Sequence, residues 1–308
     1  MAARQRIALI GNAASWHARE LLQRCRGRSI GSLVTWPELA GFVDGSGERF
    51  RPAAVAAADT LLVRGMPAGS LEQVIGRMDM LGRLAACGRR VVNPPAALEV
   101  AIDKYLATAR LAAAGLPVVP SALVQSPGQL EQAREALGSR LIGKPLFGGN
   151  GRGICRIDPG GGLPEFLGSQ GAVLVQREVP HAGWDVRVLI VGERAFSMRR
   201  IAPAGEWITN ISLGGTAASF TPPSEWIDIA RRAARTLATE IAGVDLLPGL
   251  DGSLQILEVN AVPGWRALQT VVAEDIATAV LEQAIGRKEP RPSLAPEPSP
   301  APEKQDSW

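Results

Sequence analysis

The first third of the chain alternates apolar, strand-like runs with segments of helical periodicity. The apolar run at residues 7–10 ends on Gly11, and a helical pattern that includes Trp16 and Leu21 follows it. Three further elements are expected: a strand over 60–64, a helix over 70–86 and a strand over 91–92. Apolar residues recur at helical spacing within 70–86, and prolines stop the last strand. We therefore expect residues 1–96 to form a small βα-type domain.

Strand-like segments dominate the rest of the chain. A helix over 98–114 is expected to end before Gly115 and Pro117, which are typical residues after a helix. The predicted strands are 122–125, 141–144, 154–157, 173–176, 185–191, 194–201 and 254–260. The predicted helices are 129–137, 224–241 and 273–285. We expect a mixed α/β (α+β) protein with a central part over 97–180, a C-terminal part over 181–286 and a disordered, proline-rich tail over 287–308.

Composition and charge exclude several classes of protein. Hydrophobic residues make up 46% of the 308, which is normal for a folded chain. The formal net charge of +3 is too small and too scattered to argue for nucleic-acid binding. The N-terminal apolar run is too short for a signal peptide, and no apolar stretch reaches the roughly 18 residues of a membrane span. We expect a cytoplasmic protein without nucleic-acid or membrane partners.

The residues that usually carry nucleophilic or zinc chemistry are scarce. Three cysteines without a C-x-x-C pair exclude a disulfide scaffold and a zinc ribbon. His17 and His181 are the two histidines, too few for a multi-histidine metal site. No Gly-x-Ser-x-Gly motif is present to hold a catalytic serine.

Lysine is rare, and this rarity makes two positions informative. Of the 33 basic residues only Lys104, Lys144, Lys288 and Lys304 are lysine, an imbalance that coding bias towards G+C explains. A chain with that bias keeps lysine mainly where arginine cannot substitute. Because two of the four lie in the predicted tail, Lys104 and Lys144 become candidate functional residues.

A glycine-rich loop follows Lys144. Its glycines are Gly148, Gly149, Gly151 and Gly153. Such loops let backbone N–H groups approach phosphate oxygens, and a lysine at the root supplies a compact positive charge. No Gly-Lys-Ser/Thr sequence closes the loop, so it is not a Walker loop. The alternative is a flexible hairpin loop with a chance lysine, which the scarcity of lysine elsewhere disfavours.

A second candidate site combines two carboxylates and an amide. Glu258 and Asn260 are two residues apart on a predicted strand and therefore share a face. If Asp251-Gly252 forms a two-residue hairpin turn, Asp245 lies directly opposite Glu258. Two facing carboxylates repel unless a cation lies between them, and an all-oxygen set suits Mg²⁺ or Mn²⁺. The alternative is a solvated strand face.

Asp185 and Arg187 form another polar pair on one strand face, and Arg200 lies on the strand that follows. An arginine fork binds a carboxylate or a phosphate through two parallel hydrogen bonds. A surface ladder of ion pairs explains this segment equally well.

These features together resemble the ATP-grasp superfamily and, within it, the RimK-like amino-acid ligases. The matching segments are 103–105 (Asp-Lys-Tyr), 144–153, 173–176, 185–187, Asn210 with Gly214-Gly215, and 243–245 with 258–264. The N-terminal segments 64–67, 69–73, 77–79 and 92–95 are similar to ligases that add glutamate in the synthesis of tetrahydromethanopterin-type cofactors. The resemblance implies an ATP-grasp fold in which an N-terminal βα pre-domain precedes two sub-domains that clamp the nucleotide.

The resemblance also implies a reaction. ATP phosphorylates a substrate carboxylate to an acylphosphate, and an amine then attacks it to form an amide or peptide bond, with release of ADP and phosphate. The implied substrate pair is L-glutamate and a small-molecule cofactor precursor such as a pterin. The implied assembly is a homo-oligomer, a dimer or a tetramer. Because positioning and electrostatics carry such a reaction, no enzyme nucleophile is required.

The resemblance assigns roles to the candidate residues. Nucleotide binding falls to Lys104, Lys144, Gly148, Gly149, Gly151, Gly153, Gln176, Arg177, Glu178, Val179, Asp185 and Asn210. One or two Mg²⁺ or Mn²⁺ ions fall to Asp245, Glu258 and Asn260. Orientation of the substrate carboxylate falls to Arg200 and Arg187.

The chain departs from the family pattern near two of these residues. Arg177-Glu178 stands where an acidic residue and an aromatic are common, while Ile208 and Leu213 stand where basic residues are common. These departures leave open a different substrate, slow turnover, or an Mg-ATP-binding regulator without ligase activity. A glutamate ligase that acts on a protein tail is a further alternative. A dinucleotide-dependent oxidoreductase built on the first strand is disfavoured, because Gly11 is not followed by the glycine fingerprint.

Overall fold

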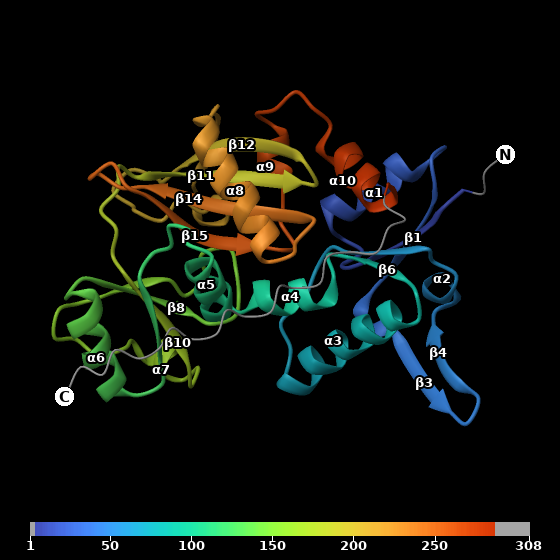
Figure 1. The fold of residues 1–308 in the computed structure, drawn as a ribbon, viewed down its shortest axis with the longest axis horizontal. Coiled ribbons are helices and arrows are strands. Elements are labelled where there is room, and N and C mark those ends of the chain that lie inside the picture. Colours follow the sequence, from blue (N-terminus) through green and yellow to red (C-terminus); the bar gives the residue numbers. More distant parts are fainter. Residues whose placement is uncertain (1–3, 287–308) are drawn as a thin grey trace.

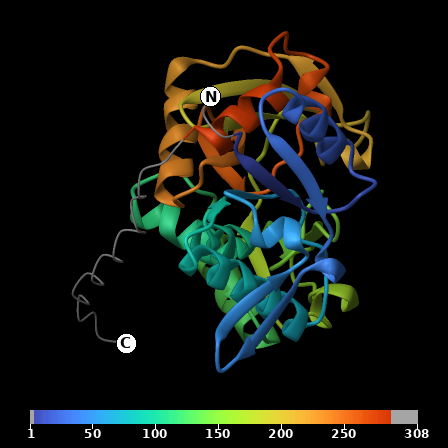
Figure 2. The same cartoon turned by 90° about the vertical axis from the view of Figure 1, so that its right-hand side faces the viewer.

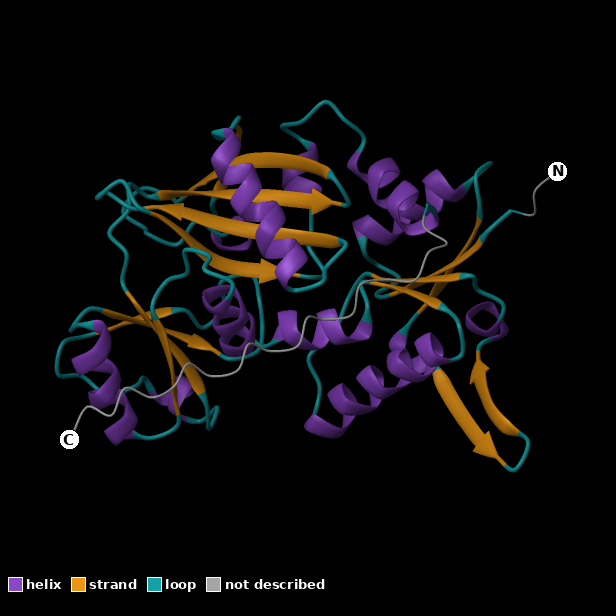
Figure 3. Cartoon of the chain, in the orientation of Figure 1, coloured by secondary structure: helices purple, strands orange, loops and turns teal. Residues whose placement is uncertain are grey.

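Three β-sheets of four or five strands follow one another along residues 4–286, and each carries its own helices (Figure 1). The computed structural model describes residues 4–286, so the tail predicted over 287–308 lies outside the described residues. Strands and helices alternate as the sequence patterns predict, and the mixed α/β class is confirmed (Figure 3).

The N-terminal sheet is fully parallel and buried on both faces. Its strands, in spatial order, are β2 (Ile30–Val34), β1 (Arg6–Ile10), β5 (Thr60–Val63) and β6 (Arg90–Val92). Its helices are α1 (Trp16–Cys25), α2 (Ala53–Ala56) and α3 (Leu71–Ala86). Along β1, Ile7 and Leu9 enter one apolar core while Ala8 and Ile10 enter another. This period of two explains why the run is continuously apolar.

A hairpin that the sequence analysis did not predict extends from this sheet (lower right in Figure 1). It consists of β3 (Ala40–Asp44) and β4 (Gly47–Arg51), and the 3₁₀ turn η1 (Trp36–Glu38) precedes it. The side chains of this hairpin are mostly exposed, so its hydrophobic pattern is weak.

The central sheet is antiparallel and smaller. Its strands, in spatial order, are β7 (Ser121–Val124), β10 (Val173–Arg177), β8 (Leu141–Pro145) and β9 (Cys155–Ile157). The helices α6 (Pro127–Leu137) and α7 (Glu165–Gly168) share an apolar core with it.

The single helix predicted over 98–114 is wrong, because the segment contains two helices. These are α4 (Pro95–Ile102) and α5 (Lys104–Ala113). Asp103 separates them with an extended backbone (φ −92°, ψ 106°), and its side chain accepts a hydrogen bond from the Leu106 N–H at 2.9 Å. This cap places Lys104 in the first turn of a new helix.

The C-terminal sheet is antiparallel and has five strands. In spatial order they are β13 (Thr216–Ser219), β12 (Arg194–Ile201), β11 (Trp184–Val191), β14 (Ile241–Pro248) and β15 (Leu254–Asn260). The associated helices and 3₁₀ turn are η2 (Ile211–Leu213), α8 (Ser224–Thr236), α9 (Arg266–Gln269) and α10 (Ile276–Ile285). Helix α8 crosses one face of this sheet (Figures 1 and 3).

The helix predicted over 224–241 is too long, and the strand after it was missed in part. Helix α8 ends at Thr236, because Ala238 adopts a left-handed conformation (φ 52°). The hydroxyl of Thr239 then donates to the Ala234 carbonyl, and the chain enters β14 at Ile241. The apolar residues of β14 continue the helical pattern closely enough to disguise this boundary.

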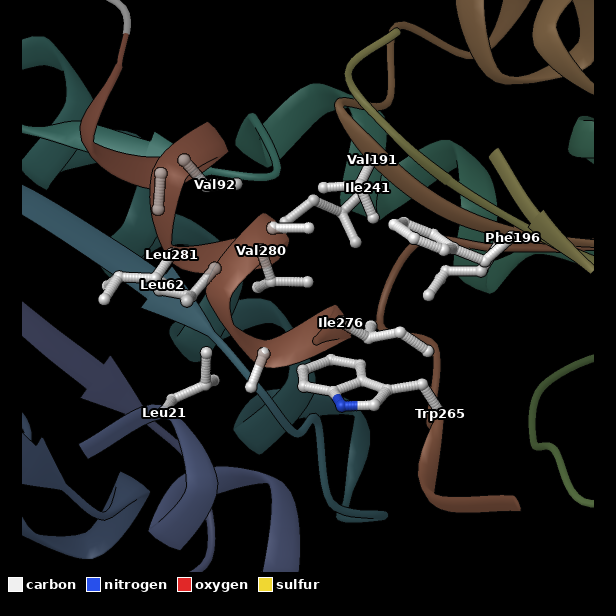
Figure 4. Packing of buried hydrophobic residues seen from close by; sticks show 14 of the residues in the cluster. Leu21, Leu62, Val92, Val191, Phe196, Ile241, Trp265, Ile276, Val280 and Leu281 are labelled. Atoms are coloured by element: carbon white, nitrogen blue, oxygen red, sulfur yellow. The ribbon is translucent and has the colours of Figure 1, made fainter. Parts of the chain in front are cut away.

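The last helix joins the two ends of the described chain. Helix α10 packs beside α1, as the red and blue ribbons show in both Figure 1 and Figure 2. Its apolar residues share one core with the N-terminal and C-terminal sheets, seen in Figure 4 where Val280 lies between Leu62 and Ile241. The N-terminal and C-terminal sheets are therefore packed through a shared core.

Asn93 anchors the same junction with hydrogen bonds. The side chain is 2% exposed and follows β6. Its amide nitrogen donates to the carbonyls of Ile241 (2.7 Å) and Ala261 (2.6 Å), and its oxygen accepts from the N–H groups of Glu240 (2.7 Å) and Ile241 (2.9 Å). One buried amide thus binds the backbone where β14 begins and where the chain leaves β15.

We expect Asn93→Ala to lower the free energy of unfolding by about 3 kcal/mol, because it leaves several buried backbone groups without partners. Asn12→Ala is the control, since Asn12 is exposed and accepts one local hydrogen bond from the Ala14 N–H. Its cost should be about 0.5 kcal/mol or less. Urea unfolding of both variants measures the difference, and equal losses would contradict the anchoring role.

Candidate functional site

A cleft lies between the central and the C-terminal sheets. Residues predicted from the sequence to bind a nucleotide, a metal or the substrate carboxylate line much of it: Lys144, Gln176, Arg177, Glu178, Val179, Asp185, Arg200, Asn210, Asp245 and Glu258. Lys104 lines a smaller adjoining cavity that shares Glu258 with the cleft. The tertiary structure therefore brings together residues that lie more than 100 positions apart.

Asp245 lies opposite Glu258, as predicted, but the local geometry differs from the predicted turn. The Gly249 N–H donates to the Ser253 carbonyl (2.8 Å), so three residues rather than two form the loop, and Gly252 takes a left-handed φ of 81°. The register then shifts by one residue beyond Leu246. This bulge in the ladder cancels the extra loop residue and restores the predicted pairing.

A buried network of charges surrounds Asp245. Arg187 forms a two-bond fork with Asp245, including Nη2 to Oδ2 at 2.8 Å, and Arg200 Nη2 lies 2.9 Å from the same Oδ2. Arg200 also donates to both oxygens of Asp185, at 2.7 and 2.6 Å. Both guanidinium groups are thus paired with carboxylates of the chain itself.

The pKa values of this network follow from burial and from opposite charges. Burial alone raises the pKa of the Asp245 carboxyl, but Arg187 and Arg200 outweigh burial and hold that pKa below its usual range. Burial likewise opposes the charge of Arg200, yet Asp245 and Asp185 raise the pKa of its guanidinium. Both shifts favour the ionised forms of Asp245 and Arg200.

The strand pattern explains why these side chains face the cleft. Val186 and Val188 of β11 point into the core beneath α8, so Asp185 and Arg187 take the opposite face. Further along β11, Leu189 on that opposite face belongs to the core shared with α10. The same face of β11 therefore carries the charged side chains of the site at Asp185 and Arg187, and a core side chain at Leu189.

Two half-buried lysines lie near the carboxylate of Glu258. Burial lowers the pKa of Lys144 to about 8, against attraction from Glu258, while nearby Lys104 adds to the lowering. Burial also lowers the pKa of Lys104, whose Nζ donates to the Gly148 carbonyl at 2.6 Å. Neither ammonium forms an ion pair within residues 4–286, which fits an anionic ligand at this point.

The glycine-rich loop contacts the C-terminal part of the chain. The Ser212 hydroxyl donates to the Asn150 carbonyl at 2.8 Å. Gly151 has a φ of 73°, and a Cβ at this position would lie 2.6 Å from Oδ1 of Asn210. Any side chain at Gly151 would therefore separate the loop from Asn210. Gly148, Gly149 and Gly153 lie in the same loop, between β8 and β9.

The connection between the two sheets forms one wall of the cleft. Its Arg177 and Glu178 N–H groups donate to the carbonyls of Pro120 and Arg140, and the side chain of Gln176 donates to the Ser121 hydroxyl at 2.9 Å. In the described chain the Val179 N–H makes no hydrogen bond, so it is available to a ligand.

The oxygen groups at the end of the cleft fit a hard divalent cation. Asp245 and Glu258 face each other, and Asn260 follows on the strand of Glu258. The Asn260 oxygen accepts the Val262 N–H at 2.8 Å, which fixes its orientation and leaves a second lone pair. No cluster of three or more His, Cys, Asp or Glu side chains is placed to hold a metal within residues 4–286. The fit therefore rests on two carboxylates and an amide, as the sequence predicted.

Several residues of the cleft were missed by the sequence analysis. The Thr209 hydroxyl donates to Asp185 at 2.7 Å, and Arg156 stacks over Trp207 at 4.7 Å while pairing with Glu178. The apolar part of the lining was also missed and comprises Val119, Ile142, Ile154, Ile208, Leu247 and Leu257. Strand alternation could have identified two of these, because Ile142 precedes Lys144 by two residues and Leu247 follows Asp245 by two.

No helix of the described residues is long and apolar enough to cross a membrane.

Known proteins resemble this chain in sequence and in fold. Residues 101–284 match the RimK-like ATP-grasp domain. A tetrahydromethanopterin:alpha-L-glutamate ligase of Methanosarcina acetivorans is 32% identical over 256 residues, which cover 73% of this chain and 79% of that protein. A probable alpha-L-glutamate ligase of Xanthomonas euvesicatoria is 31% identical over 247 residues, which cover 74% of this chain and 83% of that protein.

A solved structure gives the same fold at lower identity. The ATP-grasp ligase PsnB, complexed with a minimal precursor, Mg and ADP, has a TM-score of 0.70 and 19% identity. The similarity covers 92% of this chain and 98% of PsnB.

The lowered pKa of Lys144 predicts opposite effects of pH on stability and on nucleotide binding. Above pH 8 the folded protein loses the buried proton, while the unfolded chain keeps it up to its ordinary pKa of 10.5. The free energy of unfolding of the ligand-free protein should therefore rise with pH above about 8. The groups that act on Lys144 are Glu258, Lys104, Asp245 and Asp185. Over the same range Mg-ATP affinity should fall as the ammonium charge is lost.

Calorimetric titration between pH 7 and 9.5 measures the binding effect. Lys144→Arg is the matched variant, because arginine stays charged throughout this range. Its Mg-ATP affinity should vary less with pH than that of the parent protein. An identical pH dependence in both proteins would show that Lys144 is not the titrating group.

Proposed function

The chain belongs to the RimK-like ATP-grasp family of ATP-dependent, ADP-forming carboxylate–amine ligases, and on this premise we propose that it adds L-glutamate to a small-molecule cofactor precursor. The observation that carries the proposal is the pair of half-buried lysines near Asp245 and Glu258, with Lys144 in the cleft and Lys104 in the adjoining cavity. Partly desolvated cations without ion pairs, beside two carboxylates, suit a nucleoside triphosphate with its metal.

We assign ATP to the cleft between the central and C-terminal sheets. Lys144 and Lys104 hold the phosphate groups, and binding of an anion offsets the burial of their charges. The glycine-rich loop covers the phosphates, and Asn210 contacts that loop from the opposite side. The Val179 backbone and the apolar lining residues receive the adenine.

Magnesium, the metal that ATP-grasp ligases use, is assigned to Asp245, Glu258 and Asn260. When bound it neutralises phosphate charge. Arg187 and Arg200 pair with Asp245 and so fix the orientation of that carboxylate. The second role of these arginines, predicted from the family resemblance, is to orient the substrate carboxylate.

The reaction follows from this arrangement. An oxygen of the substrate carboxylate attacks the γ-phosphorus of ATP and ADP leaves, which gives an acylphosphate. The amine nitrogen then attacks the acyl carbon, phosphate leaves, and the nitrogen loses a proton. The chain supplies positioning and charge, so no side chain needs to form a covalent intermediate.

Glutamate is the proposed amine substrate because the matched relatives are named as alpha-L-glutamate ligases. A tetrahydromethanopterin-type pterin is the proposed acceptor, on the strength of one relative at 32% identity. A protein tail is the alternative acceptor. Cytoplasmic location and a dimeric or tetrameric state stay predictions, and light scattering of the purified protein measures the latter.

Mg-ATP should raise the melting temperature, because a ligand that binds the folded state alone stabilises it, by about 2.7 kcal/mol at a hundredfold excess over Kd. Lys144→Ala and Glu258→Ala should each abolish most of the shift. Glu135→Ala is the control, since Glu135 is exposed on α6, away from the cleft lining. Undiminished shifts in both site variants would refute the assigned nucleotide site.

Phosphate release tests the ligase reaction itself. Purified protein with ATP and L-glutamate should release phosphate when a matching pterin acceptor is added, and mass spectrometry should find the glutamyl adduct. Omission of either substrate should abolish release. If a protein tail supports turnover where pterins do not, the acceptor assignment is wrong. If ATP binds but no acceptor or amino acid supports turnover, the glutamate-ligation proposal fails.

A further inference from the structure

Arg64 is a buried cation that the proposed reaction does not use. It follows β5, is 8% exposed, and no acidic side chain within residues 4–286 pairs with it. Its Nη2 donates to the Pro263 carbonyl at 2.6 Å, while its Nε is buried without a partner. Burial lowers the pKa of the guanidinium to about 9. A buried arginine without an acidic partner is costly, and binding of an anion would offset that cost.

Polar groups from two other parts of the chain lie beside Arg64. The guanidinium carbon lies 4.4 Å from the ring centre of Trp265, whose indole N–H is also buried and unpartnered. Figure 4 shows that nitrogen on the edge of the ring that faces away from Ile276. His17 packs edge-on against Trp265, with ring centres 4.7 Å apart.

His17 adds a neutral donor rather than a charge. Burial, together with Arg64 and Arg266, lowers its pKa to about 4, so the ring is neutral at physiological pH. Its Nε2 accepts the Trp265 backbone N–H at 2.9 Å, which places the ring proton on Nδ1. The exposed Arg266 brings a second positive charge to the rim.

The topology independently marks this place as a binding position. The strand order β2-β1-β5-β6 reverses direction between β1 and β5, and ligands of parallel sheets bind beyond the carboxyl ends of strands at such a switch point. Arg64 follows β5, and its N–H donates to the Ile10 carbonyl at the end of β1 (2.7 Å). His17 lies in the first turn of α1, the helix that follows β1.

The cluster adjoins the charged network of the cleft. A Cβ at Gly243 would lie 2.8 Å from Arg187 Nη1 and 3.0 Å from Pro263 Cβ, so Gly243 separates Arg187 from Pro263. Pro263 in turn accepts the hydrogen bond from Arg64. The Arg64 cluster and the charge network of the cleft therefore lie on two sides of Gly243.

We propose that Arg64, with His17 and Trp265, forms a subsite for a non-reacting anionic group, a carboxylate or a phosphate, on one of the two ligase substrates. This assignment rests on the proposed function for the identity of the ligand, and on geometry alone for anion binding. It gives the N-terminal domain a direct part in substrate recognition.

Calorimetric titration tests the subsite with two probes, inorganic phosphate and L-glutamate. The nucleotide cleft is first filled with Mg²⁺ and a non-hydrolysable ATP analogue, so that the probes do not report on the positions of the ATP phosphates. At least one probe should bind, and Arg64→Met should weaken its binding about tenfold or more. If Arg64→Met weakens the binding of only one of the two probes, that probe identifies whether the subsite takes a phosphate or a carboxylate.

Arg89→Met is the matched control. Arg89 belongs to the same domain and also donates to a single backbone carbonyl, that of Ala58 (3.2 Å), but it precedes β6 and so lies at the opposite end of the sheet. This variant should bind the probes as the parent protein does. Equal weakening of probe binding by both substitutions would mean that the protein attracts anions generally, and this would overturn the subsite. The subsite would also be overturned if neither probe binds the parent protein at probe concentrations of about tens of millimolar.

Thermal unfolding separates an anion-binding role from a structural one. If Arg64 awaits an anion, Arg64→Met should melt at the same temperature as the ligand-free parent protein, or higher. A drop of several degrees, combined with unchanged probe binding, overturns the proposal. Should Arg64→Met fail to fold, Arg64→Lys keeps the charge and the aliphatic stem but loses the fork, and the same loss of binding is expected.

The titration does not depend on turnover. If no acceptor supports phosphate release but Arg64-dependent anion binding is found, glutamate ligation fails and the subsite stands. If turnover is found with L-glutamate and the Arg64 variants bind and react normally, the subsite fails and the ligase proposal stands.

Discussion

The buried charge network around Asp245 is the constraint on which the candidate site depends. Arg187 and Arg200 hold this carboxylate between them, and Arg200 in turn holds Asp185. Because each guanidinium and carboxylate is desolvated, removal of any member leaves a buried charge uncompensated. The network therefore requires three neighbouring strands, β12, β11 and β14, in one register, and that register also places Glu258 opposite Asp245.

Charge is balanced within this network but not around it. Lys104 and Lys144 are half-buried without ion pairs in residues 4–286 on the nucleotide side, and Arg64 is buried without one beyond the carboxyl ends of β1 and β5. Each imbalance carries a desolvation cost that an anionic ligand would offset. Positive charge without an ion-pair partner in residues 4–286 therefore lies at two separate places. The segment 260–263 connects them, because Asn260 lies on the strand of Glu258 and Pro263 accepts a hydrogen bond from Arg64.

The site could be predicted where residue type and short spacing decide its members. Lys144 was found because lysine is rare, and the facing of Asp245 and Glu258 was found by counting back from a turn. That count succeeded although the turn has three residues, because a bulge at the register shift compensates. Thr209 and Trp207 were missed, since each acts through a contact with another segment that carries no local signal.

The sequence by itself determined the fold class, the family and many of the elements, because hydrophobic periodicity and motif spacing are local properties. Lys144, Asp245 and Glu258 followed from residue type and spacing, while Gln176 and Asn210 followed from the family resemblance alone. The sequence did not determine element boundaries where the hydrophobic pattern allows the helix either to continue or to end. The break at Asp103 and the end of α8 at Thr236 are two such boundaries. The tertiary structure alone decided that α10 packs against α1 and that Arg64 lies beside Trp265 and His17. The contacts of α10 with α1 and of Arg64 with Trp265 join residues about 200 or more positions apart, and burial of shared apolar surface, not local pattern, brings them together.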